Sequence, residues 1–164
     1  MLSQYKINPD FDLVLERTAD VKPELVWKAW TEPKHLMKWF CPLPWKTVEC
    51  EIDLRPGGKF MTVMQGPEGQ KFHNLGCYLE VVENRKLVWT SALLPGYRPI
   101  QKPKNGADFP FTAIVLIEPD KKGTKYTAIG IHKDQDDCNK HKKMGFNEGW
   151  GKAFDQLVEM VKRK

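Results

Sequence analysis

The feature that most constrains the fold is an apolar stripe on the last helical segment of the sequence. When residues 146–161 are projected at roughly 100° per residue, seven apolar side chains fall within an arc of about 140°. These side chains are Phe146, Trp150, Ala153, Phe154, Leu157, Val158 and Val161. A stripe this wide has to be buried against another layer of structure. Three aspartates, Asp134, Asp136 and Asp137, precede the stripe and favour a helix N-terminus. The sequence therefore predicts a long C-terminal helix that needs a partner surface.

Two glycines flank Trp150 in the first half of this helix, although each glycine costs roughly 1 kcal/mol relative to alanine. Gly149 and Gly151 indicate either a close backbone approach to a sheet or ligand, or a bent or late-starting helix.

The partner surface is predicted from short segments in which apolar and polar residues alternate, as in half-buried strands. They are residues 11–18, 48–54, 59–64, 76–82, 87–93, 111–117 and 125–132. Turn sequences such as Arg55–Gly58, Gly66–Gly69 and Pro119–Gly123 separate several of them. This spacing is typical of an antiparallel meander.

Two short helices are predicted between the first strand and the rest, because Pro23 and Pro33 suit first helical turns. Trp27 and Trp30 give the first helix an apolar face, and Trp39 lies near the end of the second. A twisted antiparallel sheet curls around the terminal helix, and the short helices would cover one end. The predicted fold class is α+β, organised as a single domain over residues 1–164.

Five sequence motifs in order carry a family resemblance that spans roughly residues 11 to 161. They are the Ala19–Trp39 segment, the Asp-Leu-Arg-Pro-Gly-Gly sequence at 53–58, residues 76–82, residues 87–90 and Gly149-Trp150. Together they resemble the SRPBCC (START-like) superfamily. More narrowly, the chain is similar to the family named for homologues of the activator of the heat-shock chaperone ATPase.

The resemblance implies the helix-grip fold shared with birch-pollen-type proteins, in which a curved sheet and a C-terminal helix enclose a cavity. That cavity holds hydrophobic ligands in many members of the superfamily. Lipid carriers, hormone receptors, aromatic polyketide cyclases and chaperone cofactors all share this fold, so the fold alone does not define an activity.

Aromatic residues are expected to surround the cavity, since aromatic walls with a few polar groups are typical of small-molecule sites. The predicted cavity residues are Trp39, Phe40, Tyr78, Trp89, Phe111, Trp150 and Phe154. The alternative is that these rings fill the core completely and leave no open cavity. The proline-rich connection from Leu94 to Pro110 is either a gate to the cavity or an inert surface loop.

Composition excludes several other classes of protein. The net charge is +5, of which +4 lies in residues 138–164, where seven basic residues face three acidic ones. The last three basic residues are better explained as charges at a helix C-terminus than as a nucleic-acid site. No apolar run approaches the roughly 18 residues of a membrane span. With no signal peptide readable and no CxxC spacing, we expect a cytoplasmic protein with reduced cysteines.

Catalytic chemistry is not evident from the sequence. His73, His132, His141 and Cys138 are the plausible metal ligands, but their spacing matches no known site, and we predict neither a metal nor a cofactor. Cys41 and Cys77 lack a visible activating base, and neither serine lies in a G-x-S-x-G motif. An acid–base enzyme would need an ionisable group facing the cavity. The candidates for that role are Glu51, Arg55, His73, Glu80 and His132.

Three functions from different classes follow. The first is a non-enzymatic carrier or sensor that binds a small hydrophobic or amphipathic molecule. The second is an enzyme of the polyketide cyclase or dehydratase type. The third, which rests on the family name alone, is a cofactor of a chaperone ATPase. The sequence leaves open a homodimer.

Overall fold

Seven strands pair into one antiparallel sheet within residues 2–101 and 109–163, the parts of the chain that the computed structural model describes. They are β1 (Asp12–Ala19), β2 (Lys46–Ile52), β3 (Lys59–Gln65), β4 (Lys71–Val82), β5 (Lys86–Thr90), β8 (Phe111–Asp120) and β9 (Gly123–His132). Their order across the sheet is β1-β9-β8-β5-β4-β3-β2, so the first strand pairs with the last. The predicted meander is confirmed.

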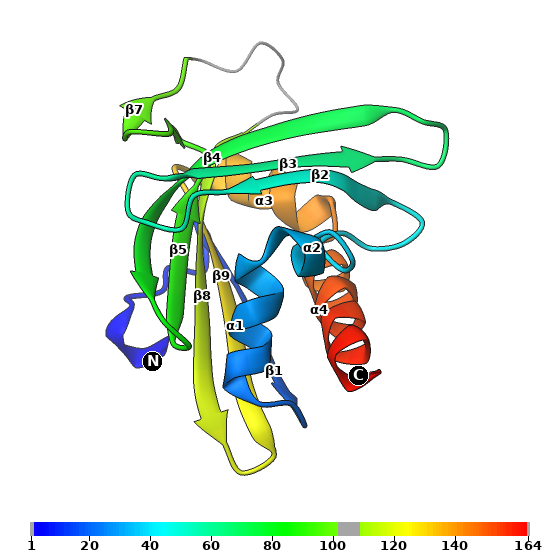
Figure 1. Cartoon of the computed structure of the whole chain (residues 1–164). Helices are drawn as coiled ribbons and strands as arrows, with labels where there is room; N and C mark the ends of the chain where they lie inside the picture. Colours follow the sequence, from blue (N-terminus) through cyan, green and yellow to red (C-terminus); the bar gives the residue numbers. More distant parts are fainter. Residues whose placement is uncertain (1, 102–108, 164) are drawn as a thin grey trace.

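The sheet is strongly curved, and its β2–β3–β4 end folds over the side on which α1 and α4 lie (Figure 1). The strand register shifts between Thr47 and Glu49 in β2 and between Tyr78 and Glu80 in β4. Such irregularities bend a strand and increase its local twist. Strand β4 also begins at Lys71, five residues before the predicted segment, because its first residues pair with β3 although their side chains are exposed.

Helices α1 (Pro23–Thr31) and α2 (Pro33–Leu36) begin at the predicted prolines. The main core lies between the concave face of the sheet and these helices together with α4 (Phe146–Lys162). Its fully buried members include Val26 of α1, Val115 of β8 and Leu157 of α4. This arrangement is the predicted helix-grip fold, in which the sheet wraps around the last helix (Figure 1).

The C-terminal segment differs from the prediction of one helix with an acidic start. Asp134 accepts a hydrogen bond from the backbone N–H of Asp137 and begins a separate helix, α3 (Gln135–Lys143). Gly145, with φ of 89°, then separates α3 from α4. A side chain is disfavoured in this left-handed conformation, so glycine permits the sharp change of direction.

The convex face of the sheet is covered by the N-terminal segment, for which the sequence had shown little pattern. Leu2, Tyr5 and Ile7 pack against a second apolar cluster formed by Val88, Ile114, Leu116 and Ile129. Both faces of the central strands are therefore buried, which explains why β8 reads as a nearly continuous apolar run.

The connection from Leu94 to Pro110 begins with a small hairpin of β6 (Leu93–Leu94) and β7 (Arg98–Pro99). Residues 102–108, in the middle of the predicted gate, lie outside the described residues. Within the described part of the chain, no helix is long and apolar enough to cross a membrane.

Candidate functional site

A cavity of about 600 Å³ lies inside the concave side of the sheet. Its walls come from α1, the loop after α2, strands β3, β4, β5 and β9, the segment around Phe111, and the α3–α4 region. A smaller hollow of about 480 Å³ lies beside residues 37–48 and Gln156. The larger cavity is the candidate site, because it contains most of the aromatic rings predicted to line one.

Six aromatic residues lining this cavity contact one another in a closed circuit, which we call the aromatic belt. Its members, in order, are Trp30, Phe40, Phe60, Trp89, Phe111 and Trp150. Neighbouring ring centroids are 5.4, 5.7, 5.0, 5.5 and 6.4 Å apart along this series, and Trp150 returns to Trp30 at 6.4 Å. Most of these contacts are edge-to-face, the arrangement favoured by aromatic quadrupoles. The belt joins four strand or loop segments to two helices.

Hydrogen bonds fix two indoles at the helical side of the belt. Trp30 Nε1 donates to the hydroxyl of Tyr126 over 3.2 Å, which links α1 to β9. Trp39, whose ring lies 4.9 Å from that of Trp30, donates through Nε1 to the backbone oxygen of Ala29 over 3.0 Å. Both indoles are buried. Their orientation is set by polar partners as well as by packing.

The loop that carries Trp39 and Phe40 is held against α4 by Gln156. The Gln156 amide donates to the backbone oxygens of Trp39 and Cys41, over 3.2 and 2.9 Å. Its side-chain oxygen accepts from the backbone N–H of Leu43 over 3.0 Å. One side chain thus fixes the position of a loop that supplies part of the cavity wall.

Five of the seven predicted cavity residues line this cavity: Trp39, Phe40, Trp89, Phe111 and Trp150. The other two are placed differently. Tyr78 stacks behind Phe60 with a centroid distance of 5.2 Å, and Phe154 stacks on Tyr126 at 4.0 Å. Both are buried and belong to the layer that supports the wall.

Sequence reasoning missed several wall residues. Trp30 and Phe60 complete the belt, and Gly149 lines the cavity at a point where an added Cβ would lie 3.8 Å from Pro42. Gly151 instead faces β1, where an added Cβ would lie 2.9 Å from the guanidinium of Arg17. The atoms nearest Gly151 belong to the end of the exposed Arg17 side chain and not to the backbone of the sheet, so the predicted close backbone approach is not seen there, whereas Gly149 leaves space in the cavity wall.

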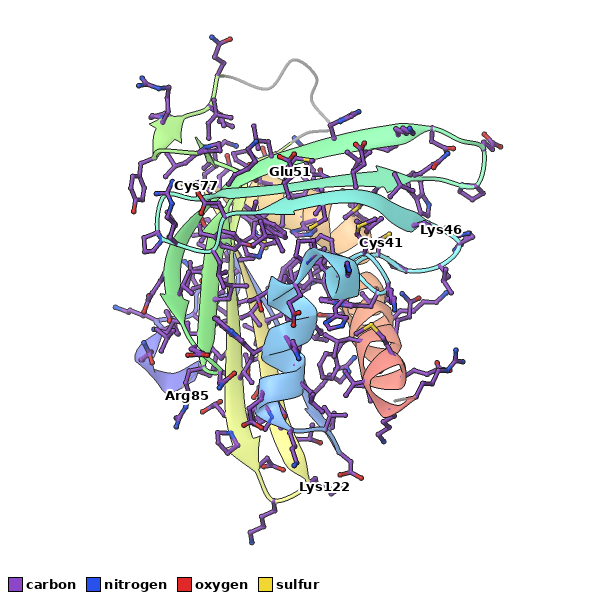
Figure 2. All side chains as sticks on the ribbon, in the orientation of Figure 1. Cys41, Lys46, Glu51, Cys77, Arg85 and Lys122 are labelled. Atoms are coloured by element: carbon purple, nitrogen blue, oxygen red, sulfur yellow. The ribbon has the colours of Figure 1, made fainter. Side chains whose placement is uncertain are left out.

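Most of the candidate acid–base residues lie away from the cavity. Glu51 on β2, labelled in Figure 2, is exposed and pairs with Lys59 at 2.9 Å. Arg55 pairs with Asp53 at 2.9 Å, and Glu80 pairs with Lys86 at 3.1 Å. Among the candidates only His73 is one of the described residues that line the cavity. Surface ion pairs of this kind explain the three charged residues without a catalytic role.

The thiols are poorly suited to nucleophilic chemistry. Burial raises the pKa of Cys41, and burial together with the charge of Glu51 raises the pKa of Cys50 to about 11. Cys77 is fully buried, and its thiol donates to the backbone oxygen of Tyr78. Figure 2 labels Cys41 and Cys77, which lie in different parts of the molecule. A raised pKa disfavours the thiolate, the reactive form.

The two histidines considered as metal ligands, His132 and His141, form a hydrogen-bonded pair. His132 Nε2 and His141 Nδ1 are 2.9 Å apart, and His132 Nδ1 lies 2.8 Å from the backbone oxygen of Phe11. Both side chains are buried, and His141 also lines the cavity. Burial, followed by the neighbouring His132, lowers the pKa of His141 to about 4. Within residues 2–101 and 109–163, no three His, Cys, Asp or Glu side chains are grouped so that they could hold a metal ion.

Comparison with known proteins agrees with this geometry. The family described as "Activator of Hsp90 ATPase homolog 1-like protein" matches residues 20–162. A crystal structure of a protein from Nitrosomonas europaea is 46% identical, with a TM-score of 0.90 and coverage of 96% of this chain and 97% of that one.

More distant structures share the fold alone. A solution structure of a protein from Arthrobacter aurescens is 21% identical, with a TM-score of 0.80, and covers 98% of this chain and 91% of its own. A protein from Rhodobacter sphaeroides is 18% identical, with a TM-score of 0.78 and coverage of 96% and 97%. No curated protein matches this sequence.

Proposed function

The chain belongs to the family of Activator of Hsp90 ATPase homolog 1-like proteins, and on that premise we propose that it binds a small apolar or amphipathic molecule in the 600 Å³ cavity. The observation that supports this proposal best is the aromatic belt. Its six rings all line this one space. A cavity of this size is within the range of small-molecule sites in proteins.

Affinity would come mainly from burying apolar ligand surface, at roughly 25 cal/mol per Å² removed from water. The belt is suited to this role because its rings are already held by each other and by the Trp30 hydrogen bond. A ligand would therefore contact rings that need little reordering. Preorganisation of this kind reduces the entropic cost of binding.

A fluorescence titration with N-phenyl-1-naphthylamine, a neutral dye whose emission rises in apolar surroundings, tests the proposal. We expect saturable binding that is strongly weakened in Gly149→Leu, because the added side chain occupies part of the cavity. Gly149→Ala is the matched control, since its Cβ would meet Pro42 at an ordinary 3.8 Å. Equal binding by all three proteins would place the dye elsewhere and contradict the proposal.

Native mass spectrometry of freshly purified protein provides an independent test. A retained small molecule would add a discrete mass that disappears on denaturation, and the same spectrum reports whether the chain is a monomer or a homodimer. The enzymatic alternative has less support, because Glu51, Arg55 and Glu80 are exposed and ion-paired outside the cavity. The chaperone-cofactor alternative still rests on the family description alone.

A further inference from the structure

The hydrogen bonds of the His132–His141 pair determine whether Nε2 of His141 carries a proton. This is the ring nitrogen of the pair that has no partner among the described residues. The backbone oxygen of Phe11 can only accept a hydrogen bond, so the hydrogen between it and His132 must lie on Nδ1 of His132. In neutral His132, Nε2 is then an acceptor. The hydrogen shared with His141 must consequently lie on Nδ1 of His141. Nε2 of His141 is left with a lone pair and no proton.

The neutral form of His141 is favoured by its surroundings. His141 contacts the rings of Phe109, Phe111 and Phe146, at centroid distances of 5.0, 4.7 and 5.0 Å. Neither histidine forms an ion pair with a carboxylate in the described part of the chain. Burying a positive charge there would be costly. The lowered pKa of His141, about 4, agrees with a neutral ring at pH 7.

His141 lines the cavity, and its Nε2 forms no hydrogen bond within residues 2–101 and 109–163. This nitrogen is not among the fully buried unpartnered atoms of the described residues, so it retains some solvent access. Two other cavity groups are already paired: Asn74 donates to Thr62 Oγ1 over 3.4 Å, and Ser91 Oγ accepts from the backbone N–H of Phe111 over 3.1 Å. The indole N–H of Trp89, which also lines the cavity, is a buried donor with no partner among the described residues. The cavity thus presents an unused acceptor beside aromatic rings.

We propose that His141 Nε2 accepts a hydrogen bond from the ligand, and that the ligand class is uncharged aromatic or polycyclic compounds bearing a phenolic hydroxyl. This inference rests on the proposed function and specifies its ligand. A phenol is a strong donor that stays neutral at pH 7, and it satisfies the acceptor that an apolar ligand would leave unpaired. An ether has no proton to donate. An ionised carboxylate would set a negative oxygen against a lone pair in a site of low dielectric.

Three probes of similar size separate these possibilities: 2-naphthol, 2-methoxynaphthalene and 2-naphthoate. Each is titrated against the wild-type protein at pH 7.5, by calorimetry or by displacement of N-phenyl-1-naphthylamine. We expect 2-naphthol to bind about tenfold more tightly than 2-methoxynaphthalene, the usual effect of one buried hydrogen bond. The carboxylate should bind most weakly.

His141→Asn is the decisive variant, because the shorter amide still reaches His132 but leaves no acceptor at the position of Nε2. The preference for 2-naphthol over its methyl ether should fall to less than about twofold, the range expected without a buried hydrogen bond. His73→Asn is the matched control, since His73 also lines the cavity but belongs to β4 and not to the pair. Its preference should remain. Loss in His73→Asn with retention in His141→Asn would overturn the assignment.

A long-range ¹H–¹⁵N NMR spectrum of the wild-type protein tests the protonation pattern without any variant. Nε2 of His141 should resonate as an unprotonated ring nitrogen at pH 7.5 and shift toward the hydrogen-bonded range when 2-naphthol is added. A protonated Nε2 in the free protein would overturn the inference. Equal affinity for all three probes would overturn it while leaving the cavity proposal intact, whereas binding of none of them or of the dye would defeat both.

Discussion

The aromatic belt and the His141 side of the cavity present different chemical groups. In the aromatic belt, each ring is contacted by its neighbours, and the indole of Trp30 has a hydrogen-bond partner. At the His141 side, Nε2 of a cavity-lining residue has no partner among the described residues. On the proposed function, the belt would favour apolar molecules in general, whereas His141 would distinguish among them. Affinity and selectivity are expected to respond to different substitutions.

The largest effect on stability should come from removing a belt residue that also belongs to the buried core. Phe60 is buried and contacts Phe40, Tyr78 and Trp89. Phe60→Ala should lower the free energy of unfolding by about 3 to 5 kcal/mol, as for other buried Phe-to-Ala changes. Chemical denaturation measures this loss. Phe72→Ala, at a position that is 55% exposed, is the control and should change stability by less than about 1 kcal/mol.

The burial of neutral His141 should make the folded protein less stable in acid. The unfolded chain protonates His141 near pH 6.5, whereas the folded protein does so at about pH 4. Between these values the unfolded state binds more protons, so stability falls as the pH falls from about 6.5 to 4, by at most about 3 kcal/mol. His132 is the titratable group that faces His141 from β9, while Asp137 and Lys140 on α3 pair with each other.

Denaturation at several pH values in His141→Phe tests this effect. The variant keeps an aromatic ring among Phe109, Phe111 and Phe146, so its stability should depend less on pH in this window than that of the wild-type protein. Carboxylates elsewhere contribute equally to both proteins and cancel in the comparison. Identical pH slopes would show that His141 is not held neutral by the fold.

Trp150→Ala should weaken dye binding. It should lower the free energy of unfolding less than Phe60→Ala does, because Trp150 is half-buried. Removing its ring takes away contacts with Trp30 and Phe111 and part of the surface offered to a ligand. Affinity for N-phenyl-1-naphthylamine should fall by about 2 kcal/mol, roughly 30-fold. Trp45→Ala is the control, since Trp45 pairs with Phe72 outside this cavity. Unchanged affinity in Trp150→Ala would exclude the belt as the binding surface.

The smallest effect concerns the loop that Gln156 holds. Gln156→Ala removes three hydrogen bonds to the backbone of residues 39, 41 and 43, and should cost about 1 to 2 kcal/mol of stability. Dye affinity should fall by only a few-fold, since Phe40 remains tied to the belt. Lys152→Ala, which removes a single exposed bond to Leu43, is the matched control. A loss in Lys152→Ala equal to that in Gln156→Ala would contradict this role for Gln156.

Local patterns predicted most of the fold. Alternation located the strands, and Pro23 and Pro33 located the starts of the short helices. The early start of β4 was missed because Phe72 and Leu75 are exposed there, so no side of the strand shows the alternation of a half-buried segment. The separation of α3 from α4 depends on the backbone conformation of Gly145, which a helical projection does not reveal.

The candidate site was predicted only in part, because its contacts join distant segments. Trp39 and Trp150 were recognisable as wall residues from their place in the expected fold, but the Trp30–Phe40 contact depends on how the loop after α2 returns. The histidine pair could have been predicted from the spacing of the two residues in the sequence. His132 ends a strand and His141 lies nine residues later in a helix capped by Asp134, and such a tight strand–turn–helix brings the two rings together.

Gly145 joins the two parts of the cavity wall that differ most. His141 lies on the helix before it and Trp150 on the helix after it, so the angle at this single residue sets the offset between the hydrogen-bond acceptor and the aromatic surface. A relative that altered only this joint would keep the aromatic belt and His141 and, on the proposed function, would accept ligands in which the hydroxyl lies at another distance from the ring system. Ligand choice would then diverge through one backbone angle, at a glycine that contributes no side chain to the cavity wall.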